Sequence, residues 1–143
     1  MTTSTSSAVW EGGLKSGKGT FSAGSGAFQG AYSFSTRFEG AKGTNPEELI
    51  AAAHAACLSM ALAAGLEKAG TPATKISTTA SCTVEIGATG IKITRMKLVV
   101  RGEVPGIEQT QFSRAAEEAK NGCPVSGAMK GNVAFDLDAL LVE

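Results

Sequence analysis

The fold is decided by residues 43–70, which read GTNPEELIAAAHAACLSMALAAGLEKAG and contain the most apolar stretch of the chain, residues 49–66. The opening run, Thr44-Asn45-Pro46-Glu47-Glu48, carries the signals of a helix N-terminus: a capping residue, a proline for the first helical position, and two carboxylates. Gly70 supplies a left-handed C-cap, and the proline two residues later prevents continuation. The stretch therefore predicts one helix over residues 46–68.

This helix has almost no polar face. One face carries apolar residues at helical spacing, and the others are mostly alanine; the spaced residues are Leu49, Ile50, Ala53, Cys57, Met60, Ala61 and Ala64. A helix apolar on nearly every side must be buried on nearly every side, which a chain of 143 residues hardly achieves alone. We therefore expect a partner subunit. His54, Ser59 and the many alanines make the stretch too weak for a convincing membrane span.

The residues before this helix are expected to form strands. Turn signals bound short strands at residues 8–14 and 17–23, and the Gly/Ser-rich residues 24–30 are typical of a loop. Residues 32–38 then alternate aromatic or methyl-bearing side chains with polar ones, a period of two that predicts a half-buried strand. Arg37 would lie on the face opposite the aromatics.

The residues after the helix predict a hairpin, two helices and a last strand. The expected elements are strands 76–86 and 91–100 joined by a turn at 88–90, a helix over 108–120, a short helix beginning at Cys123-Pro124, and a strand over 133–137. No linker separates two domains. The predicted class is α+β, one domain over residues 1–143, with antiparallel strands around a long buried central helix.

Composition narrows the class of protein. Thirteen basic and thirteen acidic residues balance, so no charge excess points to nucleic acid. Residues 2–7 are Thr and Ser, without the basic and apolar regions of a signal peptide. Three cysteines are too few, and odd in number, for a secreted disulfide framework. We expect a cytoplasmic protein in which any disulfide is transient and functional.

Two of the cysteines are candidates for chemistry. Cys57 lies within the apolar helix, where a thiol is often a buried small hydrophobe and is inert unless a cation reaches it. Cys123 precedes a proline at an expected helix start, where backbone N–H groups favour a thiolate. On local grounds a structural role stays open for both.

The third cysteine and the single histidine favour structural roles. Cys82 alternates with aliphatic residues on one strand face, which indicates a core position. His54 lies three residues before Cys57, yet no third residue of a Cys–His hydrolase is evident. His54 and the three cysteines form a set that zinc accepts, but without a Cys-x-x-Cys pair the ligands are scattered, and we expect no metal.

Several motifs together resemble the OsmC/Ohr family, in particular its osmotically inducible protein C branch. The resemblance spans nearly the whole chain in order. It rests on the segments Trp10-Glu11-Gly12, Gly17-Lys18-Gly19-Thr20, Thr36-Arg37-Phe38-Glu39-Gly40, residues 43–57, Val104-Pro105-Gly106-Ile107 and Asn121-Gly122-Cys123-Pro124-Val125-Ser126.

The resemblance implies an intertwined homodimer that reduces organic hydroperoxides. Two active sites would lie at the subunit interface, with Cys57 as the peroxidatic cysteine and Cys123 as the resolving cysteine. The family's arginine and glutamate fall on Arg37 and Glu47, and Glu48 would serve as the capping partner. The resemblance further implies a lipoyl-type dithiol as reductant. No cofactor is expected, and neither nucleic acid nor membrane as a partner.

Helix geometry bears on the dimer independently. Glu47 and Cys57 are ten residues apart, which is about 15 Å along a straight helix and roughly 80° around its axis. Glu47 therefore cannot touch Cys57 of its own chain. If both serve one site, they come from different subunits.

The hypothesis for the reaction follows from these roles. Arg37 would lower the pKa of Cys57, and Glu47 would hold the guanidinium. The Cys57 thiolate would attack the peroxide and become a sulfenic acid, which Cys123 would convert to a disulfide for a dithiol to reopen. The apolar residues Leu49, Leu58 and Met60 favour an alkyl or fatty hydroperoxide over hydrogen peroxide.

A non-catalytic alternative also fits the cysteines. In a redox-sensing thiol module, oxidation of Cys57 and Cys123 would switch a binding surface. A sensor reacts once, whereas an enzyme consumes peroxide repeatedly. The sensor hypothesis does not explain Arg37 and Glu47.

Overall fold

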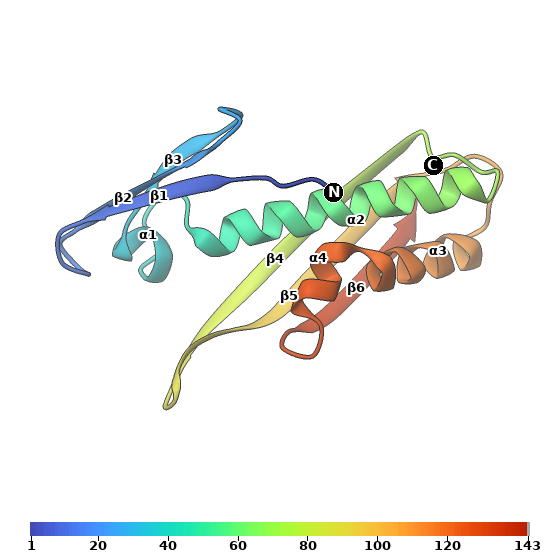
Figure 1. The fold of residues 1–143 in the computed structure, drawn as a ribbon. Coiled ribbons are helices and arrows are strands. Elements are labelled where there is room, and N and C mark those ends of the chain that lie inside the picture. Colours follow the sequence, from blue (N-terminus) through green and yellow to red (C-terminus); the bar gives the residue numbers. More distant parts are fainter. Residues whose placement is uncertain (143) are drawn as a thin grey trace. The chain divides into compact units, whose positions relative to one another are not determined.

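The computed structural model describes residues 1–142 and has an α+β fold of two three-stranded sheets with helices (Figure 1). The chain packs as two compact units, Met1–Leu49 and a second that begins at Ile50. The expectation of a single domain over residues 1–143 therefore stays a prediction. Glu143, the last residue of that predicted domain, lies outside the described residues. The elements in chain order are β1 (Ser6–Glu11), β2 (Lys18–Ala23), β3 (Gln29–Tyr32), α1 (Phe34–Phe38), α2 (Pro46–Lys68), β4 (Lys75–Gly87), β5 (Gly90–Glu103), α3 (Gln109–Gly122), α4 (Pro124–Met129) and β6 (Ala134–Leu141).

The sheet of the first unit is an antiparallel meander, β1-β2-β3. Gly19 pairs with Trp10 on one side and with Tyr32 on the other, and the two rings approach to 5.5 Å between centroids over it. A Cβ at Gly19 would lie 2.5 Å from the Tyr32 ring, so only glycine lets the rings meet. The strands predicted at 8–14 and 17–23 are confirmed with shifted ends, and β3 begins inside the predicted loop 24–30.

The strand predicted over residues 32–38 is wrong beyond Tyr32, because residues 34–38 form the helix α1. Ser33 ends the strand and caps the helix: its hydroxyl accepts from the Thr36 N–H, and the Thr36 hydroxyl accepts from the Ser33 N–H. These bonds satisfy donors that a strand would leave open. The spacing of Phe34 and Phe38, four residues, suits one helical face as well as alternation does, and their rings lie 5.2 Å apart.

The long helix α2 matches its prediction at both ends. The Asn45 side chain accepts from the Glu48 N–H at 2.9 Å, which caps the first turn. Gly70 adopts a φ of 85°, and the Thr71 N–H beyond it donates to the Leu66 carbonyl at 2.9 Å.

The packed face of α2 differs from the predicted stripe. His54, Leu58 and Leu62 are fully buried, whereas Met60 is 77% exposed. Residues four apart form the packed row, because i, i+4 neighbours lie along one line of a helix. Within one chain the helix is thus not buried on all sides, and burial by a partner subunit stays a prediction.

By length and composition alone, α2 is long and apolar enough to cross a membrane. It is the one such helix within residues 1–142. A single helix of this kind is weak evidence, because core helices of globular proteins pass the same test.

The second unit is built on the sheet β4-β5-β6, with α2 and α3 packed on one face (Figure 1). Alternate residues of β5 point into the core and meet Leu58 and Leu62 of α2 and Phe112 of α3; these β5 residues are Met96, Leu98 and Val100. Gly102 continues this row, where a Cβ would lie 2.4 Å from the Phe112 ring.

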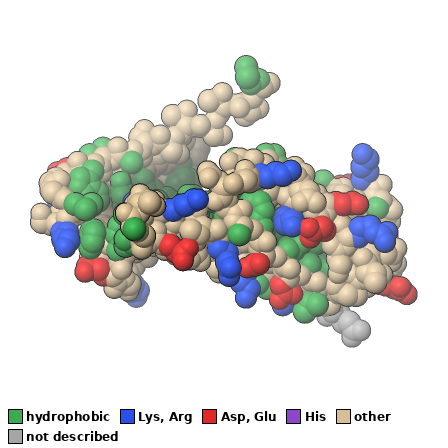
Figure 2. Space-filling view, turned by 90° about the horizontal axis from the view of Figure 1, so that it is seen from below, with side chains coloured by type: hydrophobic (Ala, Val, Ile, Leu, Met, Phe, Trp, Pro, Cys, Tyr) green, Lys and Arg blue, Asp and Glu red, His purple; other side chains and the backbone are tan. Residues whose placement is uncertain are grey.

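The direction of β6 corrects the prediction of an all-antiparallel sheet. β4 and β5 form the predicted antiparallel hairpin, but β6 pairs with β5 in parallel. The 30 residues between β5 and β6 (104–133) contain α3 and α4 and form the crossover that parallel neighbours require. Figure 2 shows basic and acidic side chains interspersed on the face in view, in agreement with the balanced composition.

Candidate active site

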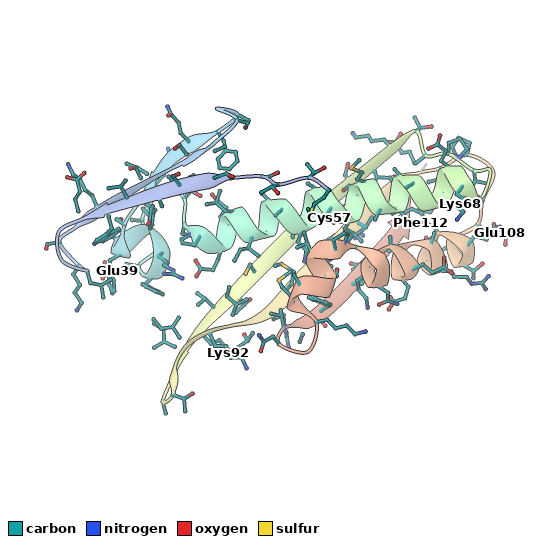
Figure 3. The ribbon with its side chains drawn as sticks, viewed as in Figure 1. Glu39, Cys57, Lys68, Lys92, Glu108 and Phe112 are labelled. Atoms are coloured by element: carbon teal, nitrogen blue, oxygen red, sulfur yellow. The ribbon has the colours of Figure 1, made fainter. Side chains whose placement is uncertain are left out.

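The structure brings Cys57 and Cys123 together across 66 positions of sequence. Cys57 lies midway along α2 (Figure 3), and Cys123 lies between α3 and α4. Their Sγ atoms are 2.7 Å apart and share a hydrogen bond, and both residues are thiols. A disulfide bond is about 2.05 Å long, so small side-chain rotations suffice to join them. Cys57 is partly exposed, whereas Cys123 is only 1% exposed.

The two thiols are in direct contact, so the ionisation of each depends on the charge of the other. Burial raises the pKa of the Cys57 thiol and the contact with Cys123 raises it further, while the Val125 N–H lowers it in part. The two residues that act on it, Cys123 and Val125, belong to the second unit, and neither is a cation. A reactive thiolate at Cys57 therefore needs a positive charge from elsewhere.

Cys123 has more polar surroundings. It ends α3 and precedes Pro124, the first residue of α4, as the sequence predicted. Burial raises its pKa, but hydrogen bonds from Cys57, from the Ser126 backbone and hydroxyl and from the Val125 backbone together bring that pKa below its ordinary value. In the reduced pair, these donors favour negative charge on the inner sulfur, Cys123.

His54 and Ser126 extend this polar cluster into the core. His54 is fully buried, Ser126 is 3% exposed, and His54 Nε2 lies 2.7 Å from Ser126 Oγ. Sequence reasoning assigned His54 a structural role and missed Ser126. The available signal was the position of Ser126 three residues after Cys123, where a side chain on the first turn of a helix can reach back to the residue before it.

Arg37 and Glu47 form an ion pair within the first unit. Arg37 Nε donates to both carboxylate oxygens of Glu47 at 2.9 and 3.2 Å, and Nη2 donates to Oε1 at 2.7 Å. Asn45 Nδ2 donates to the Thr36 carbonyl at 3.0 Å and ties the start of α2 to α1. Glu47 is 5% exposed, so its carboxylate has little contact with water, while Arg37 keeps a third of its side chain exposed. The contact is the one the hypothesis requires; its catalytic role stays a prediction.

Cys82, the third cysteine, is not part of this cluster. Cys82 is half-buried in β4 and packs against the core of the second unit. Within residues 1–142 no group of three or more His, Cys, Asp or Glu side chains is placed to hold a metal ion.

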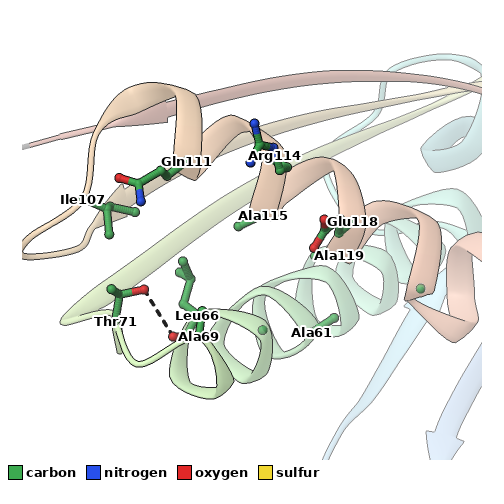
Figure 4. A pocket seen from close by; sticks show the side chains of 12 residues that line it. Ala61, Leu66, Ala69, Thr71, Ile107, Gln111, Arg114, Ala115, Glu118 and Ala119 are labelled. Atoms are coloured by element: carbon green, nitrogen blue, oxygen red, sulfur yellow. Dashed lines mark hydrogen bonds between the residues drawn. The ribbon is translucent and has the colours of Figure 1, made fainter.

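A separate groove of about 460 Å³ lies between α2 and α3 (Figure 4). Alanines and glycines line much of it, with Leu66 on the α2 side and Gln111, Arg114 and Glu118 on the α3 side. No cysteine or histidine is among its lining residues, so it offers neither a thiol nor an imidazole.

Comparison with known proteins shows which family the chain resembles. The model of the family described as OsmC-like protein matches residues 39–138. The chain is 50% identical over 130 residues to Peroxiredoxin OsmC of Escherichia coli K12, covering 90% of this chain and 91% of that protein. It is 32% identical over 97 residues to an organic hydroperoxide resistance protein of Xanthomonas axonopodis pv. citri, a match that covers 66% of this chain and 65% of that protein.

The fold agrees with a solved structure. An organic hydroperoxide resistance protein of Elizabethkingia anophelis superposes with a TM-score of 0.79 over 99% of both chains, at 24% identity. Sequence match, fold and the paired cysteines lead to one assignment: the chain belongs to the OsmC family.

Proposed function

We propose that this protein is a thiol-dependent peroxidase that reduces organic hydroperoxides to alcohols. Family membership, with a peroxiredoxin and organic hydroperoxide resistance proteins among the relatives, supports peroxidase activity. The observation that carries the mechanism is the 2.7 Å approach of Cys57 Sγ to Cys123 Sγ. We also propose a cytoplasmic location, because three cysteines are too few, and odd in number, for a secreted disulfide framework.

The first step is attack by the Cys57 thiolate on the distal oxygen of the hydroperoxide. The O–O bond breaks, the alkoxide leaves as the alcohol after taking up a proton, and Cys57 becomes a sulfenic acid. Because burial raises the pKa of Cys57, a cation must offset the loss of solvation. Arg37 suits this role, since a guanidinium stays protonated even when desolvated. Glu47 fixes its orientation through the bidentate contact.

The Arg37–Glu47 pair acts across a homodimer in this proposal. Glu47 and Cys57 stand ten residues apart on one helix, about 15 Å along its axis, so a shared site needs two chains. The exposed apolar face of α2 supports such an assembly. It consists of Ala52, Ala53, Ala56, Met60, Ala63 and Ala64, small residues that allow close approach of another helix.

The second step closes the disulfide. Cys123 attacks the Cys57 sulfenic acid, the S–O bond breaks, and hydroxide leaves as water with the proton that Cys123 gives up. A dithiol, of lipoyl type by family resemblance, then reduces the disulfide and is itself oxidised. Cys57 is the sulfur that a reductant can reach, because Cys123 is almost fully buried.

An apolar hydroperoxide is the preferred substrate. Leu58 is fully buried in the core and is therefore not available to a substrate, contrary to the sequence expectation. Leu49 remains partly accessible, whereas Met60 lies on the face of α2 that this proposal assigns to the partner subunit. Apolar surface buried against such residues contributes about 25 cal/mol per Å².

The test is repeated turnover of cumene hydroperoxide with excess dihydrolipoamide. We expect wild-type protein to turn over, Cys57→Ser to be inactive, and Cys123→Ser to react once and stop at the sulfenic acid. Cys82→Ser is the matched control, since it removes a cysteine outside the cluster, and should retain turnover. Consumption of at most one equivalent per site by the wild type would favour the redox-sensing alternative.

A further inference from the structure

We propose that Ser126 and His54 are positioning residues for Cys123, forming a buried chain of hydrogen-bond donors that ends on the Cys123 sulfur. The inference rests on the proposed function and assigns the chain to its second half: closure of the disulfide and its reduction. His54 and Ser126 belong to different elements, α2 and α4, and meet only in the folded unit.

The geometry isolates this chain from water. His54 is 0% exposed, Ser126 3% and Cys123 1%. His54 Nε2 lies 2.7 Å from Ser126 Oγ. Ser126 lies in the first turn of α4, three residues after Cys123, and its hydroxyl lowers the pKa of the Cys123 thiol. The His54 ring also packs edge-on against Phe135 of β6, with centroids 5.4 Å apart, which holds it in one orientation. Polar groups buried in this way act strongly on one another because water does not screen them.

The tautomer of His54 follows from the partners available. His54 Nδ1 is buried and has no hydrogen-bond partner among residues 1–142. A neutral imidazole has one N–H and one bare nitrogen, and burial lowers the pKa of His54, so the ring stays neutral. Placing the proton on Nε2 gives the N–H an acceptor, Ser126 Oγ, and leaves only the bare Nδ1 unsatisfied. Ser126 then has its own proton to donate to Cys123 Sγ.

A donor chain directed at Cys123 serves disulfide closure. At that stage Cys57 is a sulfenic acid, and Cys123 must give up its proton to become a nucleophile. The Ser126 hydroxyl stabilises the resulting thiolate, and the His54 N–H polarises that hydroxyl. The proton from Cys123 leaves with the hydroxide of the sulfenic acid as water, so His54 and Ser126 themselves neither gain nor lose a proton.

The same chain serves reduction. The reductant thiolate attacks the accessible Cys57 sulfur, the S–S bond breaks, and its electrons go to Cys123 as leaving group. Thiol–disulfide exchange is faster when the leaving thiolate is better stabilised. In the first step Cys57, not Cys123, carries the negative charge, so loss of the Ser126 donor should not slow the attack on peroxide.

The experiment separates these steps. One equivalent of cumene hydroperoxide is mixed with reduced protein, samples are quenched with acid, and mass spectrometry follows loss of thiol and growth of the disulfide. Ser126→Ala should oxidise Cys57 at least as fast as wild type and close the disulfide about tenfold more slowly, the effect of losing one hydrogen bond to a charged group. Closure at the wild-type rate would overturn the proposal.

Substitutions at His54 provide the rescue. His54→Leu removes the N–H and should slow closure as Ser126→Ala does, whereas His54→Gln carries an amide N–H near the position of Nε2 and should restore it. If the leucine variant does not fold, Ser126→Ala decides alone. Ser59→Ala is the matched control, because the Ser59 hydroxyl donates a bond of the same 2.7 Å length to Thr78 of β4, which is not part of this chain of donors. Its closure rate should equal that of the wild type.

A second arm does not depend on peroxidase activity. The disulfide is formed with diamide and reduced with excess dithiothreitol. Ser126→Ala should be reduced about tenfold more slowly than wild type or Ser59→Ala, because Cys123 leaves less readily. If the wild-type protein does not reduce peroxide but Ser126→Ala is still reduced more slowly by dithiothreitol, the proposed function is wrong and the role of Ser126 stands. Equal reduction rates would remove the role of Ser126.

Discussion

The guanidinium of Arg37 makes three hydrogen bonds to the Glu47 carboxylate, which is 5% exposed. A carboxylate buried to this degree holds its partner firmly, because the loss of either charge would leave the other poorly solvated. One side of the guanidinium is thus committed to Glu47. Arg37 remains about a third exposed, so the rest of the group is available to a negative charge from another chain.

Replacing Arg37 should therefore slow the first chemical step. Arg37→Met removes the cation, the pKa of Cys57 rises, and less thiolate is present at neutral pH. We expect peroxide attack to fall about a hundredfold near pH 7, measured by stopped-flow consumption of cumene hydroperoxide, and to recover as pH rises. Arg37→Lys keeps the charge but not the bidentate contact, so its rate of peroxide attack should lie between those of wild type and Arg37→Met. An Arg37→Met variant with the wild-type rate and pH profile would exclude a role in activating Cys57.

Mixed dimers test whether Arg37 acts across the interface. At pH 7, the Cys57→Ser homodimer should be inactive and the Arg37→Met homodimer about a hundredfold slower than wild type. If Arg37 serves the cysteine of the partner subunit, a heterodimer of the two variants has one intact site and one with both defects. If Arg37 serves its own chain, both sites carry one defect each. Co-expression with two affinity tags yields the heterodimer, and recovery of about half the wild-type turnover supports the crossed arrangement. An inactive heterodimer would contradict it.

The sequence predicts the elements whose determinants are local. The ends of α2 follow from Asn45, Pro46 and Gly70, each of which acts on its own turn, so cap chemistry was sufficient there. Residues 32–38 show the limit of periodicity: five to seven residues fit a strand and a helix alike, and the Ser33–Thr36 capping box decides for the helix. The parallel pairing of β6 depends on where α3 and α4 return the chain, which no local pattern encodes.

The candidate site was less predictable from local sequence patterns than the ends of α2. Spacing alone left Cys57 and Cys123 as possible core cysteines, and only the family motifs paired them; the 2.7 Å contact results from packing α4 against α2. Ser126 was not predictable, because its significance comes from burial beside His54. The apolar stripe of α2 was misassigned for a related reason: alanine on every side leaves no polar face to mark which side packs inward.

Met60 offers a test of the assembly. It is 77% exposed in the single chain, on the alanine-rich face that we assign to the partner subunit. Met60→Glu should place an unpaired charge in that interface, which costs several kcal/mol, and shift the protein to monomers in sedimentation velocity at micromolar concentration. Ile86→Glu adds the same charge at an exposed apolar residue near the β4–β5 turn and should leave the dimer intact. Identical sedimentation of Met60→Glu and wild type would remove this face from the interface.

His54 makes stability depend on pH in a way that one variant can isolate. Burial lowers the pKa of His54 below its ordinary 6.5, so in acid the unfolded chain binds a proton that the folded chain excludes. The free energy of unfolding should therefore fall as pH decreases below about 6.5, until the pKa of the folded state is reached.

The chain has a single histidine, so His54→Gln removes this contribution alone and should lose less stability between about pH 7.5 and pH 5.5 in urea titrations at equal protein concentration. Carboxylates titrate in both proteins and cancel in the comparison. Parallel losses in the two proteins would mean that His54 takes up a proton in the folded state as readily as in the unfolded one, and the neutral ring that the donor chain to Cys123 requires would then have no support.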